Sequence, residues 1–163
     1  MKKIIPFIIV LLLLAGCSYG NQEELDELYN AFERNHSEIE EDFKNYYSEI
    51  DSSDDREIQL KIIYDELIPM TEDFRTTIEN YTVSNKEHES LKENMLSYID
   101  SLKELTELNG EFNRKFVSSN PLSDENFTDD INSMLQEIED KENEVKNGYD
   151  NITEEYENLT SEQ

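Results

Sequence analysis

The chain has 163 residues, with 14 basic side chains, 40 acidic side chains, a net charge of −26 and one cysteine. One cysteine excludes an internal disulfide framework and a multi-cysteine zinc site, and the length accommodates one domain. The negative charge argues against nucleic acid as a partner, because phosphate binding requires clustered Lys and Arg. Four glycines and three prolines argue against a loop-rich or all-β chain.

The N-terminus has the pattern of a secretory signal peptide. Lys2 and Lys3 precede an apolar run of 12 residues, from Ile4 to Ala15, which only Pro6 interrupts. A membrane-spanning helix needs about 20 apolar residues, so this run is too short to span a bilayer. It predicts a signal peptide over residues 1–16 that is removed from the mature chain.

The sequence Leu14-Ala15-Gly16-Cys17 follows the apolar run. It resembles the lipobox, the processing signal of bacterial lipoproteins. The resemblance implies cleavage before Cys17, a diacylglyceryl group on its sulfur and an acyl chain on its amine as an additional modification. Each buried methylene contributes about 0.8 kcal/mol, so two or three acyl chains anchor a protein stably. The alternative is an ordinary signal peptide that leaves Cys17 as a free thiol.

Cleavage there defines the rest of the predicted organisation. Removing residues 1–16 removes two lysines and no acidic residue, so the net charge changes from −26 to −28. We expect residues 17–22 to form the lipidated cysteine and a short tether, and residues 23–160 to form a helical domain. Five extended tether residues reach about 15 Å, which places the domain near the outer face of the membrane.

Apolar residues then recur at spacings of three and four, which predicts four amphipathic helices of about 30 residues each. The four apolar stripes are Leu25, Leu28, Phe32, Ile39, Phe43, Tyr46 and Ile50; Leu60, Ile63, Leu67, Met70, Phe74, Ile78 and Tyr81; Leu91, Met95, Tyr98, Leu102, Leu105, Phe112 and Phe116; and Phe127, Ile131, Met134, Ile138, Val145, Tyr149, Ile152, Tyr156 and Leu159.

Two of the breaks between these segments contain residues that are typical of a helix N-terminus. Asp54 with Glu57, and Ser84 with Glu87, have the spacing of capping boxes. In a capping box the first side chain accepts a hydrogen bond from the backbone of the first helical turn. The second and third helices are therefore predicted to begin just after Asp54 and Ser84.

Helix-breaking residues mark the other boundaries. Pro69 lies inside the second segment and predicts a kink or a split near Ile68. Gly110 weakens the third segment near its end. Pro121 stops that segment, because proline cannot continue a helix, and Ser123 is the predicted cap of the fourth.

One stripe on each helix requires a shared core, and short connections make sequential helices antiparallel neighbours. The predicted fold is all-α, an antiparallel up-down bundle of three to four long, coiled-coil-like helices. The alternative is an extended coiled-coil hairpin with the fourth segment detached, since that segment is the most polar. High charge and a mean hydropathy of −0.80 favour disorder. The chain also has seven Phe and nine Tyr, most of them on the stripes, and these favour folded helices.

The residues that could carry chemistry do not form a recognisable site. The carboxylates lie mostly off the stripes, on solvated faces, so we expect no catalytic residues and no enzyme. The stretch from Asp51 to Asp55 resembles the start of a calcium loop. However, Arg56 stands where an EF-hand needs Gly, and Ile62 stands where it needs the bidentate Glu. We expect no metal site and no cofactor beyond the lipid on Cys17.

The two histidines and three of the tyrosines are the remaining candidates for a functional role. His36 and His88 have no neighbouring ligand in sequence, so packing is the favoured interpretation and a two-histidine metal site across helices is the alternative. Tyr29, Tyr47 and Tyr64 flank their stripes. They either contact a partner or pack at the rim of the bundle.

A lipobox followed by acidic amphipathic helices resembles the small cell-wall-binding lipoproteins of Gram-positive bacteria. Only Leu14-Ala15-Gly16-Cys17 matches as a motif, so no binding residues are transferred. A domain with a net charge of −28 is repelled by anionic wall polymers, and salt screens this repulsion over a Debye length of about 10 Å. Contact with the wall would require bridging cations or recognition of neutral sugars and peptides.

The expected function is a non-enzymatic, membrane-anchored interaction module for an envelope protein or a cell-wall component. The alternatives are a ligand-binding lipoprotein that serves a membrane transporter, and an accessory or inhibitor lipoprotein of an envelope enzyme. A large ordered pocket would favour the ligand-binding alternative. An exposed apolar groove would favour an interaction or accessory role.

Overall fold

The computed structural model describes residues 5–53, 55–119 and 124–161, with side chains from Gln22 onward except that of Asp51. The regular structure of these residues is entirely helical, which confirms the predicted all-α fold. It consists of α1 (Ile5–Ser52), α2 (Arg56–Ile62), a π-helical turn (Ile63–Leu67), α3 (Ile68–Glu79), α4 (Lys86–Ser118) and α5 (Phe127–Ser161).

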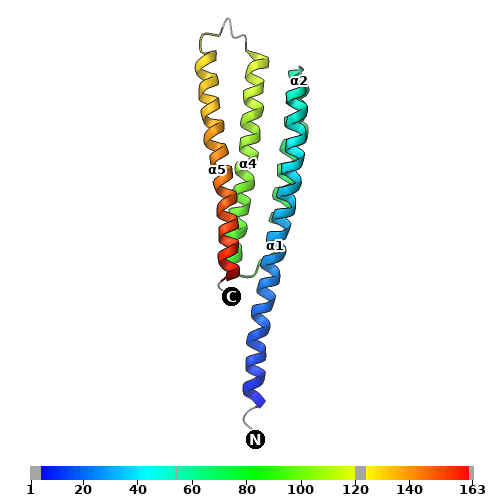
Figure 1. Ribbon diagram of the computed structural model, residues 1–163, viewed down its shortest axis with the longest axis vertical. Coiled ribbons are helices and arrows are strands. Elements are labelled where there is room, and N and C mark those ends of the chain that lie inside the picture. The colour runs from blue at the N-terminus through cyan, green and yellow to red at the C-terminus, as the bar shows by residue number, and fades with distance from the viewer. Residues whose placement is uncertain (1–4, 54, 120–123, 162–163) are drawn as a thin grey trace.

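The helices form an up-down-up-down bundle (Figure 1). The continuous run of α2, the π turn and α3 lies alongside α1, and α4 and α5 form the other pair. Helix α4 is central, because it contacts α5, α3, α2, the π turn and α1. The alternative of a hairpin with a detached fourth segment is wrong, because α5 packs along α4 and buries Ile138 and Ile152.

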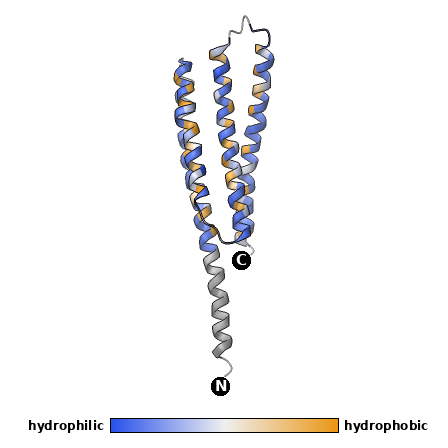
Figure 2. Cartoon of the chain, turned by 180° about the vertical axis from the view of Figure 1, so that it is seen from behind, coloured by the Kyte–Doolittle hydropathy of each residue, from blue (hydrophilic) through white to orange (hydrophobic). Residues whose placement is uncertain are grey.

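The core consists of two apolar clusters. The larger surrounds Phe32, whose ring centroid lies 5.4 Å from that of Phe74 and 5.5 Å from that of Tyr98. The smaller joins the end of α1 to the π turn through Ile50, Ile62, Ile63 and Leu67. Figure 2 shows apolar residues interspersed with hydrophilic ones along the helices, as amphipathic helices require. The predicted stripes supply most members of both clusters.

The capping residues predicted for the second and third helices are wrong by one position. The N-cap of α2 is Asp55, whose carboxylate accepts a hydrogen bond of 2.9 Å from the Glu57 backbone N–H. The N-cap of α4 is Asn85, which accepts one of 2.9 Å from the Glu87 N–H. Ser84 instead donates two hydrogen bonds to Glu24 on α1, one from its N–H and one from its hydroxyl.

Three residues predicted to mark helix boundaries lie in the gaps between the described ranges. The predicted cap Asp54, the stop signal Pro121 and the predicted cap Ser123 lie outside the described residues. Helix α4 ends at Ser118, just before the stop signal.

The kink or split predicted near Ile68 takes the form of a change in helix type, because the π turn ends at Leu67 and α3 begins at Ile68. Proline has no N–H to donate, which weakens the helical hydrogen-bonding pattern where Pro69 begins a new turn. The Ile68 N–H donates to the carbonyl of Ile63, five residues earlier. The turn brings the neighbouring residues Ile62 and Ile63 both into the core. The predicted stripe contained only Ile63.

Residues 17–22, expected as a short tether, continue α1 as helix. The stretch contains no proline, so nothing in it obliges the helix to stop. A helix rises 1.5 Å per residue, so Cys17 and Glu24 are about 10 Å apart along α1. None of the helices in the described part of the chain is both long enough and apolar enough to cross a membrane.

Exposed ion pairs connect neighbouring helices. Arg75 Nε lies 2.8 Å from Asp100 Oδ1, joining α3 to α4. Lys141 Nζ lies 2.7 Å from Glu104 Oε2, joining α5 to α4. Pairs this exposed contribute only about 0–1 kcal/mol each, so the apolar clusters provide most of the stability.

We expect Gly110→Ala to destabilise the bundle and Gly148→Ala not to. A Cβ at Gly110 would lie 2.8 Å from Tyr64 Oη and 3.1 Å from Ile63 Cγ2, whereas one at Gly148 would lie 3.4 Å from Tyr98 Cδ2. Overpacking costs about 1–3 kcal/mol and exceeds the gain of about 1 kcal/mol from helix propensity. Urea denaturation of both variants measures the difference. Equal stability of the two variants would contradict the close packing of Tyr64 on α4.

Candidate functional site

Helices α1 and α5 approach each other closely only at the end of the bundle near the C-terminus. There Tyr29 stacks on Tyr156 with ring centroids 3.7 Å apart, and Tyr156 Oη donates to Asp26 Oδ1 at 2.9 Å. His36 stacks on Tyr149 at 4.3 Å. Beyond this point the two helices diverge, with α4 between them in both views (Figures 1 and 2).

The divergence leaves an open groove, the α1–α5 groove, with α4 as its floor. It consists of two hollows of about 320 and 240 Å³, which share Leu105 and Glu142. Its lining residues are His36, Phe43 and Tyr47 from α1; Tyr98, Leu102, Leu105, Thr106 and Asn109 from α4; and Glu142, Val145, Lys146, Tyr149 and Asp150 from α5.

The titratable aromatic residues of the groove are neutral at pH 7. Burial lowers the pKa of His36, although the charges of Glu33 and Glu40 act in the opposite direction. Burial, with a further contribution from the charge of Glu142, raises the pKa of Tyr47 to about 12. Burial and then Glu33 raise the pKa of Tyr149 to about 12. The charges of the groove lining therefore belong to residues of α5.

The side chains that line the α1–α5 groove determine what kind of partner surface it can bind. Its floor has Leu102 and Leu105 at its centre, flanked by Tyr98, Thr106 and Asn109. Its walls carry aromatic rings, and its charged groups come from Glu142, Lys146 and Asp150. Apolar cores with polar rims are typical of protein interfaces. The groove is therefore suited to the apolar face of a partner.

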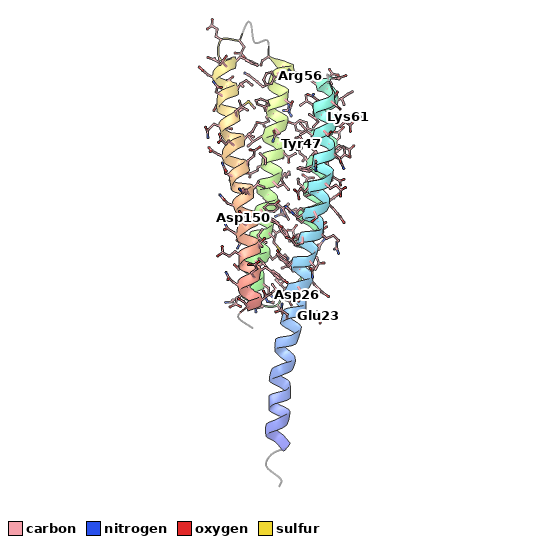
Figure 3. All side chains as sticks on the ribbon, in the orientation of Figure 1. Glu23, Asp26, Tyr47, Arg56, Lys61 and Asp150 are labelled. Carbon is pink, nitrogen blue, oxygen red and sulfur yellow. The ribbon has the colours of Figure 1, made fainter. Side chains whose placement is uncertain are left out.

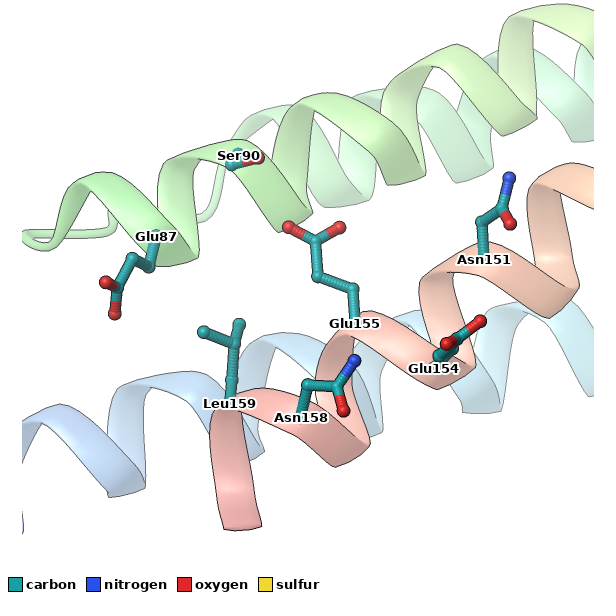
Figure 4. Close-up of a pocket in the computed structure, with 7 residues that line it drawn as sticks. All are labelled: Glu87, Ser90, Asn151, Glu154, Glu155, Asn158 and Leu159. Carbon is teal, nitrogen blue, oxygen red and sulfur yellow. The ribbon is translucent and has the colours of Figure 1, made fainter. Parts of the chain in front are cut away.

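A second hollow, of about 400 Å³, lies between α4 and α5 near the C-terminal end of α5 (Figure 4). Its lining is Glu87, Ser90, Asn151, Glu154, Glu155, Asn158 and Leu159. The Glu155 carboxylate points toward α4 and accepts a hydrogen bond of 2.6 Å from Asn94 Nδ2. Within the described ranges, no group of three or more His, Cys, Asp or Glu residues is placed to hold a metal ion.

Glu24 connects α1 to the turn between α3 and α4. Its carboxylate accepts hydrogen bonds from the Ser84 N–H at 2.8 Å and the Ser84 hydroxyl at 2.7 Å, and lies 3.0 Å from His88 Nδ1. Burial of the carboxyl favours its neutral form, but the hydrogen bonds from Ser84 and His88 outweigh this effect and lower its pKa. Figure 3 places the neighbouring Glu23 at this end of the bundle.

The two histidines are not brought together. His36 lies in the α1–α5 groove, whereas His88 is 1% exposed and contacts Glu24. The favoured packing role is confirmed for both, and the two-histidine site is not formed. Cys17 and residues 14–16 lie within the helical backbone of α1, before the first described side chain.

The three flanking tyrosines pack at the edges of the bundle. Tyr29, Tyr47 and Tyr64 are all half-buried. Tyr29 stacks on another ring, Tyr47 lines the groove, and the Arg114 guanidinium lies 4.7 Å from the centroid of Tyr64. Each of the three therefore packs at the rim of the bundle.

Sequence reasoning identified Leu102 and Leu105 as core residues but missed Thr106, Asn109 and Glu142 as groove residues. No local signal could have identified them, because the groove depends on the divergence of two helices that are far apart in sequence.

Comparison with protein-family models, with curated proteins and with solved structures finds no match to this chain.

Proposed function

We propose that this protein is a non-enzymatic lipoprotein, anchored through Cys17 to the outer face of the cell membrane. Its helical bundle would bind an envelope protein or a cell-wall component. The observation that carries the proposal is Leu14-Ala15-Gly16-Cys17 at the end of a 12-residue apolar run. A run of that length suits a secretory signal rather than a membrane span.

The geometry of α1 supports this arrangement. Because α1 is helical from Cys17 into the bundle, the lipid would lie about 10 Å along the helix from Glu24. The α1–α5 groove, between His36 and Tyr47, would lie about 30–45 Å along α1 from Cys17. A surface at that distance is beyond the lipid headgroups and accessible to an envelope partner.

The form of the groove favours an interaction module over a ligand-binding receptor. Both hollows are open along the side of the bundle and lined by apolar and aromatic side chains. Small-molecule sites are typically enclosed clefts that bury most of the ligand. An accessory or inhibitor lipoprotein would use the same groove to bind the protein that carries the chemistry.

We expect Cys17→Ser to release the protein from membranes while the bundle stays folded. Serine cannot form the thioether that holds the diacylglyceryl group, and two or three acyl chains are needed for stable anchoring. Fractionation of cells that produce the full chain measures the shift from membrane to soluble fractions. Ser18→Ala, at the neighbouring residue, is the control and should stay in the membrane. Membrane retention of Cys17→Ser would count against lipid anchoring.

Sedimentation with purified cell-wall sacculi separates the two classes of partner. The detergent-solubilised full chain is mixed with sacculi at two salt concentrations, with and without calcium. Binding that requires calcium indicates cation bridging to an anionic polymer. Binding that is insensitive to salt and calcium indicates recognition of neutral sugars or peptides. No sedimentation under any condition directs the search to an envelope protein.

A further inference from the structure

The dimensions of the α1–α5 groove match a short helix. Its floor follows α4 from Tyr98 to Asn109, which corresponds to about 16 Å or three helical turns. Leu102 and Leu105 lie along this floor. A helix that presents apolar residues at positions i, i+3 or i+4, i+7 and i+11 covers about 16 Å, the same length.

The charge of the protein restricts the chemistry of that helix. Glu142 and Asp150 at the groove outnumber Lys146, and removal of residues 1–16 takes the net charge from −26 to −28. A second copy of the chain would bring an equal negative charge against this one, and an acidic partner would be repelled in the same way. Lys and Arg side chains beside an apolar face would instead complement both the floor and the rim.

We propose that the α1–α5 groove binds a basic amphipathic helix of an envelope protein. The apolar face of the helix would contact Leu102 and Leu105, and its Lys or Arg side chains would pair with Glu142 and Asp150. The inference rests on the function proposed above and names the class of partner and the surface that binds it.

Methyl NMR of the full chain in neutral detergent micelles tests the proposal. The protein carries labelled leucine methyl groups and is titrated with a synthetic helical peptide of about 14 residues, or about 21 Å. The peptide has Leu on one face and Lys elsewhere, and a twin peptide replaces every Lys with Glu. We expect the methyl signals of Leu102 and Leu105 to shift with the Lys peptide and not with the Glu twin.

A matched pair of charge reversals separates the groove from general electrostatics. Glu142→Lys should weaken binding of the Lys peptide by about fivefold or more, since it reverses a charge beside the groove floor. Asp140→Lys changes the net charge equally but lies about 200° around α5 from Glu142, so it should leave the affinity nearly unchanged. Both residues are exposed, so neither substitution should disturb the fold.

The proposal would be overturned by equal weakening with both variants, by equal shifts with the Glu twin, or by shifts that avoid Leu102 and Leu105. Shifts of these two methyl groups with protein concentration alone would place a second copy in the groove and would also overturn it. If the peptide fails to bind while Cys17→Ser still releases the protein from membranes, only this inference fails. Retention of Cys17→Ser in membranes would count against the proposed function independently.

Discussion

Leu102→Asp and Leu67→Asp are each expected to unfold the bundle. Leu102 is 8% exposed in the cluster around Phe32, and Leu67 is fully buried in the cluster beside the π turn. A buried carboxylate without a partner costs several kcal/mol, and the protonated form still buries an unsatisfied polar group. Domains of this size are stable by about 5–15 kcal/mol, so one such change removes a large part of the stability.

Thermal melting of the full chain in micelles, followed by circular dichroism, measures this loss. Ile58→Asp is the matched control, because Ile58 lies on α2 and is 46% exposed. We expect the control to melt near the wild-type temperature and both buried variants to melt far below it. Unchanged melting of both buried variants would refute the assignment of the two clusters.

Glu24→Ala is expected to destabilise the bundle by about 1–3 kcal/mol, because it leaves the buried His88 side chain without the partner of its Nδ1. The carboxylate accepts two hydrogen bonds from Ser84 and contacts His88, which is 1% exposed. Glu23→Ala is the control, because Glu23 is exposed beside it on α1. Urea denaturation at pH 7 compares the two variants. Equal effects would show that the contact with Ser84 and His88 contributes no stability.

The contribution of Glu24 should also depend on pH. Its pKa is lowered in the folded state from 4.5, so the folded protein favours the carboxylate more than the unfolded chain does. The stabilisation is therefore fully present above about pH 4.5 and is lost as the pH falls through the lowered pKa. The difference between wild type and Glu24→Ala should narrow below that pH. A difference that is constant down to pH 3 would assign the effect to packing alone.

The sequence predicted the helices well because their signals are local. Leu25, Leu28 and Phe32 are spaced at three and four residues, and all three are buried. Pro69 likewise predicted an interruption near Ile68, where the π turn ends, since a missing N–H disturbs the helix wherever it packs. In contrast, the cap of α4 is Asn85 and not the predicted Ser84, which binds Glu24, 60 residues earlier in the chain. A capping-box pattern covers only four residues, so it cannot reveal a hydrogen bond to a residue 60 positions earlier.

The sequence by itself therefore determined the all-α class, the four helical segments and their apolar faces, because helix period and burial are properties of neighbouring residues. Tertiary structure alone decided the packing of α5 on α4, the fit of Tyr64 against Gly110 and the contact of Glu24 with His88. It also created the α1–α5 groove. Each of these features depends on the separation and rotation of whole helices, which are set by side chains far apart in the chain.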